Sequence, residues 1–112
     1  MRRGEVWWAS LPAPDGSAPG YRRPVVVVQA NDFNDSAIRT VVVLPLTTNL
    51  QLAAAPGNVL CRRRETRLTK HSVANVSQPL TIDKTRLTEK VATLPATLQT
   101  RIDEGLRVVL AL

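Results

Sequence analysis

Short apolar runs separated by polar turns dominate the first half of the chain. Three of them, rich in strand-forming residues, predict strands at residues 5–11, 24–29 and 40–46. The second and third runs are almost continuously aliphatic, which is typical of strands that are buried on both faces. Pro45 lies within the third run and cannot donate to a sheet ladder, so we expect a strand end, an edge or a bulge there.

Weaker patterns predict shorter elements between these runs and beyond them. Residues 59–61 and 72–76 have the composition of strands, and the second alternates enough to have one solvent-facing side. The polar segment 31–36 has the character of a turn and has room for one turn of helix. Residues 81–87 could hold another helical turn, with Asp83 as its cap.

The last part of the chain carries the clearest helical pattern. Pro95 suits the first position of a helix. Apolar residues then recur at helical spacing and form one stripe: Leu94, Leu98, Ile102, Leu106 and Val109. Gly105 weakens this helix by up to about 1 kcal/mol relative to alanine, so we expect it to pack closely against another backbone.

Together these elements predict a mainly β fold with a C-terminal helix. Five or six short strands favour a curled antiparallel sheet, SH3-like or barrel-like, with the helix packed on it. The 112 residues, 44% of them hydrophobic, suffice for one domain with a modest core. One helix covers such a sheet only in part, so we expect a homodimer to complete the burial.

Several features predict a soluble cytoplasmic protein with no segment inserted in a membrane. No apolar run reaches the roughly 18 residues that a membrane span requires. The basic N-terminus lacks the apolar stretch of a signal peptide. Cys61 is the only cysteine and cannot form an internal disulfide, which fits a reducing compartment. We expect Cys61 to be a buried or half-buried strand residue.

The charge points to an anionic partner. Fifteen Lys and Arg residues against nine Asp and Glu residues give a net charge of +6. Such a basic domain suits nucleic acid, an anionic membrane or an acidic protein, and composition alone does not choose among them. An aromatic content of 4% disfavours a platform of several stacked rings, as in an RRM domain.

Most familiar catalytic motifs are missing from the sequence. One histidine and one cysteine without paired spacing disfavour a zinc site, and we expect no metal and no cofactor. The sequence contains no P-loop, no G-x-G-x-x-G and no G-x-S-x-G. His71 fits a surface loop better than a catalytic base.

What remains is arginine, threonine, serine and asparagine at strand ends and in loops, and these residue types suit phosphate. RNA carries its own nucleophile, the 2′-hydroxyl. An enzyme that cuts RNA without a metal must orient that hydroxyl, stabilise the crowded phosphorane and help the 5′-oxygen to leave. Arginine and threonine can supply preorganised donors for the phosphorane.

Two strand ends carry suitable residues. Arg23 lies where a glycine-containing loop meets a buried strand, and Thr47 and Thr48 follow another buried strand. From the residues alone, a solvated charge and plain strand propensity explain these positions at least as well as catalysis does.

A run of basic residues in the expected exposed loop at 62–67 is a further candidate. It comprises Arg62, Arg63 and Arg64, with Arg67 and Lys70 nearby. Such a run either binds phosphate or keeps a solvated loop soluble.

Six segments of the chain occur in the order and with the residues of a known family. They are 3–8 (RGEVWW), 16–29 with its GSAPG loop and RRPVVVVQ strand, 42–49 (VVLPLTTN), 56–59 (PGNV), 72–78 (SVANVSQ) and 82–87 (IDKTRL). With these segments the chain resembles the MazF/PemK toxins of type II toxin–antitoxin systems over nearly its whole length, residues 1–112. The Arg-Pro-Val run together with the Leu-Thr-Thr-Asn turn is the specific part of the resemblance.

The resemblance implies a fold and an activity. The fold is an SH3-like barrel of the MazF/CcdB kind with a C-terminal helix, working as a homodimer. The activity is sequence-specific, metal-independent cleavage of single-stranded RNA to 2′,3′-cyclic phosphate and 5′-hydroxyl ends, which inhibits translation and growth. The implied inhibitor is a cognate MazE-like antitoxin whose acidic, flexible tail occupies the RNA groove.

The resemblance also implies roles for particular residues. The family's active-site arginine falls on Arg23, which would stabilise the phosphorane and protonate the leaving oxygen. Its threonine falls on Thr47, which would hold the scissile phosphate, while the loop 16–20 would close over the RNA. The implied RNA-binding residues, to which we add the basic run, are Gly16, Ser17, Gly20, Arg22, Gln29, Asn31, Thr48, Arg62, Arg63 and Arg64.

Other functions remain open at this stage. A gyrase poison of the same fold would use C-terminal aromatic residues, and the last five residues, VVLAL, contain none. A non-catalytic barrel that binds nucleic acid would shift RNA without cutting it, and a degenerate toxin would bind its antitoxin only.

Overall fold

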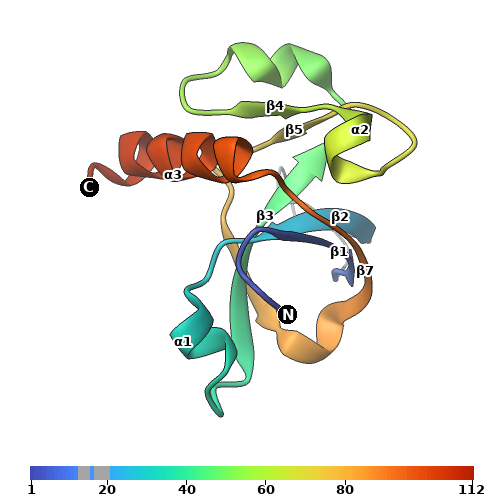
Figure 1. The fold of residues 1–112 in the computed structure, drawn as a ribbon, viewed down its shortest axis with the longest axis vertical. Coiled ribbons are helices and arrows are strands. Elements are labelled where there is room, and N and C mark those ends of the chain that lie inside the picture. The colour runs from blue at the N-terminus through green and yellow to red at the C-terminus, as the bar shows by residue number, and fades with distance from the viewer. Residues whose placement is uncertain (13–15, 17–20) are drawn as a thin grey trace.

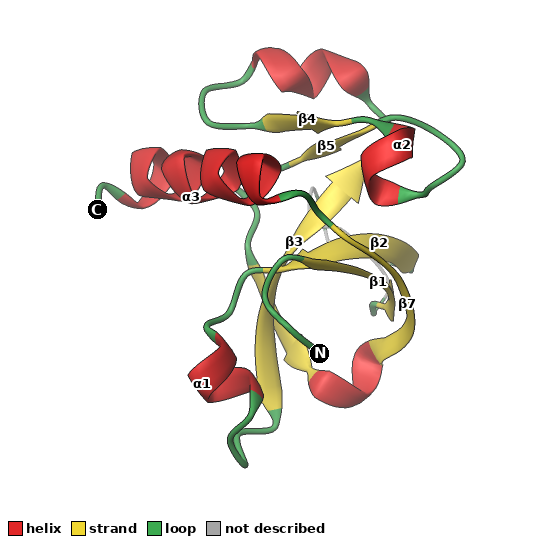
Figure 2. Cartoon of the chain, in the orientation of Figure 1, coloured by secondary structure: helices red, strands yellow, loops and turns green. Residues whose placement is uncertain are grey.

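The computed structural model describes residues 1–12, 16 and 21–112. The strands within these residues are β1 (Glu5–Ser10), β2 (Arg22–Val27), β3 (Thr40–Thr47), β4 (Val59–Cys61), β5 (Ser72–Ala74), β6 (Leu80–Asp83) and β7 (Leu87–Thr93). The helices are α1 (Asn31–Asn34), α2 (Arg63–Thr66) and α3 (Ala96–Leu110), with 3₁₀ turns η1 (Leu50–Ala54) and η2 (Lys84–Arg86). Figure 2 shows how strands predominate before the long C-terminal helix.

The strands form one antiparallel sheet in the order β4-β5-β3-β2-β1-β7, with β6 paired to β3. β3 is the longest strand and pairs with β2 on one side. On its other side it pairs first with β6 and then, from Leu46, with β5. In the view of Figure 1 the sheet of β1, β2, β3 and β7 curls below α3, and β4 and β5 lie above it. The predicted mainly β fold with a C-terminal helix is therefore confirmed.

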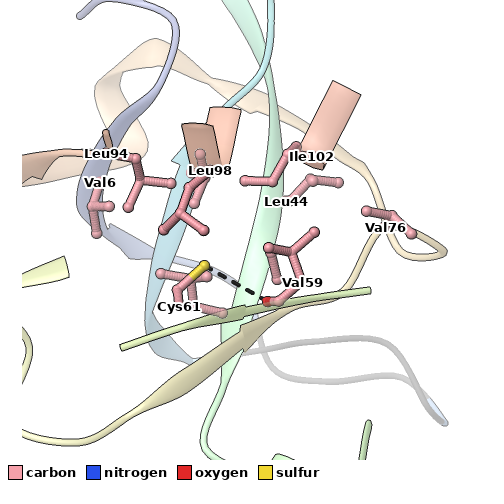
Figure 3. Close-up of a cluster of buried hydrophobic side chains, with 11 residues drawn as sticks. Val6, Leu44, Val59, Cys61, Val76, Leu94, Leu98 and Ile102 are labelled. Atoms are coloured by element: carbon pink, nitrogen blue, oxygen red, sulfur yellow. Dashed lines mark hydrogen bonds between the residues drawn. The ribbon is translucent and has the colours of Figure 1, made fainter. Parts of the chain in front are cut away.

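Two hydrophobic clusters explain why the central runs are continuously apolar. Alternate residues of β2 and β3 enter different clusters: Val26 and Leu44 enter the first, and Val25 and Val43 enter the second. These strands therefore bury both faces, as the sequence predicts. Figure 3 shows the first cluster, where α3 meets the sheet.

Helix α3 covers the first cluster with most of its predicted stripe. Leu94, Leu98 and Ile102 are buried and Leu106 is partly buried, whereas Val109 is 41% exposed. Gly105 is buried as well, and its Cα approaches the backbone of Gly57. The predicted close packing of this glycine against another backbone is confirmed.

The strand does not end at Pro45, but on one side of the strand this residue lies at a local edge, as predicted. β3 continues through this residue to Thr47, and Pro45 pairs in register with Val25 of β2. The partner on the opposite side changes at this point, because pairing with β6 ends at Val43 and pairing with β5 begins at Leu46. A proline fits where the strand exchanges one neighbour for the next.

Two further local predictions are corrected by tertiary packing. The expected loop at 62–67 contains helix α2, in which the Glu65 carboxylate accepts the Arg62 N–H at 2.9 Å and Thr66 is buried. The strand predicted at 72–76 was expected to have one solvent-facing side. Strand β5 has none, since Ser72–Ala74 are all buried between β4 and β3.

Within the described ranges, no helix is both long and apolar enough to cross a membrane. Cys61 lies in β4 with its thiol buried, as predicted, and its Sγ contacts the Val59 carbonyl oxygen at 3.6 Å (Figure 3). Burial raises the pKa of this thiol to about 11.

We expect Cys61 to react slowly with a disulfide reagent at pH 8 in the folded protein. Burial blocks access, and little thiolate forms so far below the raised pKa. Adding denaturant should release one reactive thiol per chain, measured by absorbance of the reagent. Rapid labelling of the folded protein would contradict this packing.

Glu5 at the start of β1 is a buried acid with three partners. Burial alone would raise its pKa, but Lys90, the Trp7 indole N–H and the Arg2 backbone N–H bind the carboxylate and hold the pKa below its ordinary value. The charged form therefore stabilises the fold.

We expect the Glu5→Gln variant to be less stable than wild type at pH 7. The gap should narrow as the pH falls from about 4.3, the ordinary glutamate pKa, towards the lowered pKa of Glu5, because the unfolded state binds a proton in this range before the folded state does. Urea unfolding curves at several pH values measure this. A gap that is independent of pH would show that the loss comes from packing instead.

Candidate functional site

A cavity of about 290 Å³ lies where β2 begins and β3 ends. Its described lining residues are Trp8, Arg22, Arg23, Pro24, Leu46, Thr47, Thr48, Leu68, Thr69, Lys70 and Ser72. The antiparallel pairing of β2 with β3 brings the first residues of one strand beside the last residues of the other. The structure therefore brings together four residues that the sequence offered at two separate places: Arg22, Arg23, Thr47 and Thr48.

Arg23 is held on a rigid element and is only half-buried. Its strand lies between β1 and β3, and its backbone pairs in register with Ala9. Among residues 1–12, 16 and 21–112, no hydrogen bond or ion pair of its guanidinium is found. The side chain thus has its donors available for a ligand in the cavity.

Thr47 presents an oriented hydroxyl. Its Oγ1 accepts a hydrogen bond from the Asn49 backbone N–H at 3.2 Å, so the hydroxyl proton is left to donate elsewhere. Asn49 in turn caps η1, because its side-chain oxygen accepts the Gln51 N–H at 3.3 Å. Thr48 follows at the exposed rim. The turn after β3 therefore fixes a donor beside Arg23.

The rest of the cavity wall adds positive charge and one aromatic ring. The Arg22 guanidinium lies over the Trp8 ring, 4.1 Å from its centroid, which is a cation–π contact. Lys70 supplies a third cation, and none of the described lining residues is acidic. Sequence reasoning did not place Trp8, Thr69 or Ser72 here. Only the aromatic character of Trp8 could have drawn attention to it.

Two predicted RNA-binding residues lie elsewhere, beyond the other end of β2. The Gln29 side-chain amide donates to Asn34 Oδ1 and to the Thr40 carbonyl oxygen, both at 3.1 Å. Asn31 Oδ1 accepts the Arg3 N–H at 2.7 Å. Both amides therefore fasten α1 and the N-terminal segment, and neither residue lines the cavity.

The basic run is divided by the structure. Arg63 lines a second cavity together with Lys70 and His71, whereas Arg62 and Arg64 are exposed and line neither cavity. His71 is exposed before β5, as predicted, and its Nδ1 accepts the Arg63 backbone N–H at 3.0 Å.

The remaining candidates are in the loop between β1 and β2. Ser17 and Gly20 lie outside the described residues. Gly16 has a φ of +62°, a conformation that glycine adopts without strain. In the part of the chain that is described, no three His, Cys, Asp or Glu side chains gather into a group that could hold a metal ion.

The fold and the cavity define a class: a small curled β-barrel protein with a C-terminal helix and a cation-lined site without acidic residues in its described wall. A sequence profile of the family described as "PemK-like, MazF-like toxin of type II toxin-antitoxin system" matches residues 2–110. Since this match spans almost the entire chain, the protein belongs to that family.

Individual relatives agree with this assignment. The chain is 46% identical to "Endoribonuclease MazF6" of Mycobacterium tuberculosis, over all of this chain and 98% of the relative. It is 36% identical to "Endoribonuclease EndoA" of Bacillus subtilis, over all of this chain and 96% of the relative. Among solved structures, MazF from Deinococcus radiodurans superposes with a TM-score of 0.82 at 20% identity, covering all of this chain and 97% of that one.

Proposed function

We propose that this protein is a metal-independent endoribonuclease that cuts single-stranded RNA at specific sequences and so inhibits translation and growth. One observation carries the proposal: the Arg23 guanidinium, which has no partner among the described residues, and the oriented Thr47 hydroxyl share one cavity that is lined by cations. The relatives named endoribonucleases support the same activity.

The residues of the cavity suit transesterification within the RNA. The 2′-oxygen attacks the adjacent phosphorus, the bond from phosphorus to the 5′-oxygen breaks, and the products are a 2′,3′-cyclic phosphate and a 5′-hydroxyl. Thr47 donates to the scissile phosphate, and Arg23 stabilises the phosphorane and gives a proton to the leaving 5′-oxygen. We assign the 2′-proton to water, because the described wall offers neither carboxylate nor imidazole.

The surface also supports the proposed partners. An acidic antitoxin tail would find Arg22, Arg23 and Lys70 in the cavity without a competing acid among its described lining residues. We propose that 1–112 form one toxin domain and that two copies associate. Exposed apolar residues at the end of α3 are available for this association: Val108, Val109, Leu110 and Leu112. The single buried, unpaired Cys61 fits a cytoplasmic location.

The test is to incubate the purified protein with long single-stranded RNA in excess EDTA and to map the new 5′-ends. We expect discrete cuts at one sequence motif, with 5′-ends that require phosphorylation before ligation and with 2′,3′-cyclic phosphates. Intact RNA in the presence of folded protein would overturn the proposal, and RNA that is bound but uncut would favour a non-catalytic barrel.

A further inference from the structure

A second cavity of about 310 Å³ adjoins the first. The two share Thr48, Thr69 and Lys70 as lining residues, so they form one continuous groove. The second cavity is completed by Leu50, Arg63 and His71. None of its described lining residues is acidic.

Arg63 and Lys70 are available to bind an anion. Within the described part of the chain, neither forms an ion pair with a carboxylate. The neighbouring acid, Glu65, is already engaged by the Arg62 N–H at 2.9 Å. The described residues therefore leave the two positive charges in this cavity without an ion-pair partner.

His71 adds a directed donor to the same cavity. Its Nδ1 accepts the Arg63 backbone N–H at 3.0 Å, so the neutral ring carries its proton on Nε2. The contact also ties the segment before β5 to the first residue of α2. The ring is thereby fixed with a donor on the atom that has no partner among the described residues.

We propose that this second cavity binds a backbone phosphate that flanks the scissile one, with Arg63 and Lys70 supplying charge and His71 Nε2–H donating a hydrogen bond. This inference rests on the proposed ribonuclease function. The RNA backbone then runs from Arg23 and Thr47 past Thr48 and Thr69 to Arg63. Leu50, which is exposed at the rim, offers an apolar contact to a base. Arg63 and His71 are positioning residues, since they act on affinity and register and do not touch the reacting atoms.

The test measures binding of 2′-O-methyl oligoribonucleotides, which lack the nucleophile, by fluorescence anisotropy at several KCl concentrations. For an octanucleotide, Arg63→Ala should weaken binding about tenfold. It should also reduce the slope of log K against log [KCl] by about 0.7, the loss of one phosphate contact. Binding of a dinucleotide, which occupies only the first cavity, should not change.

The chain provides matched controls. Arg86→Ala removes the same charge from an exposed position in η2, outside both cavities, and it should leave the affinity and the slope unchanged. His71→Gln places an amide N–H donor near the position of Nε2 and should bind the octanucleotide nearly as the wild type does. His71→Asn places its amide near the position of Nδ1, leaves no donor at the position of Nε2, and should bind the octanucleotide less tightly. All three positions tested are exposed, and thermal unfolding verifies that the variants fold.

The outcomes separate this inference from the proposed function. If the wild type neither binds the octanucleotide nor cuts RNA, the ribonuclease proposal fails. If it does both and Arg63→Ala behaves like Arg86→Ala, only the second subsite is wrong. If Arg63→Ala weakens binding of poly-glutamate but not of the octanucleotide, the cavity serves an acidic protein tail and the RNA subsite is overturned.

Discussion

Replacing Arg23 by alanine is expected to lower the rate constant for RNA cleavage by at least about a hundredfold. The variant lacks the preorganised, charged donor that the guanidinium directs at the phosphorane. Stabilisation of this kind is among the largest single contributions to such catalysis. Stability should change little, because the guanidinium has no partner within the described residues that would be left unpaired. Single-turnover cleavage at saturating enzyme measures the chemical step directly.

Two variants make this result specific. Arg23→Lys keeps the charge but loses the planar, two-pronged donor, so its rate should lie between those of the wild type and the alanine variant. Arg86→Ala removes a cation of the same kind from η2, outside the groove, and should cleave as the wild type does. Equal losses from Arg23→Ala and Arg86→Ala would mean that only the net charge matters, and Arg23 would then have no role at the reacting atoms.

The sequence predicted those elements whose pattern is complete within one segment. Local spacing predicts the burial of the aliphatic runs in β2 and β3 and of the apolar stripe in α3, and the structure confirms this burial. Strands β6 and β7 were not predicted, because their sequences LTID and LTEKVAT mix polar and apolar residues without a strong period. Their extended form depends on pairing with β3 and β1, which are distant in sequence.

For the candidate site, too, the local sequence predicted the residues but not their arrangement, which depends on tertiary structure. Residue chemistry alone offered Arg23 and Thr47 as separate possibilities, and the resemblance to a family joined them. The strand register that places them in one cavity is a tertiary property. Gln29 and Asn31 illustrate the limit of this reasoning. Their amides suit RNA as well as any others, yet the partners that engage them, such as Thr40 and Arg3, could not be read from the local sequence.

The Gly105→Ala substitution is expected to destabilise the fold even though alanine favours helices. A Cβ at this position would collide with the carbonyl oxygen of Gly57, which is backbone and cannot rotate away. Asn58 holds that turn in place: its side chain donates to the Leu52 carbonyl oxygen at 3.0 Å and accepts the Val76 N–H at 2.9 Å. Relief of the collision therefore requires α3 or the start of β4 to move.

The balance of two effects sets the size of this change. Overpacking costs about 1–3 kcal/mol, and the gain in helix propensity returns up to about 1 kcal/mol. We therefore expect a net loss of about 1–2 kcal/mol, seen as a fall in Tm of roughly 5–10 °C. Thr100→Ala, at an exposed position of the same helix, should leave Tm unchanged or slightly raised. If Gly105→Ala also raised Tm, the turn at Gly57 would have to yield, and the close approach of the two backbones would not limit how α3 packs on the sheet.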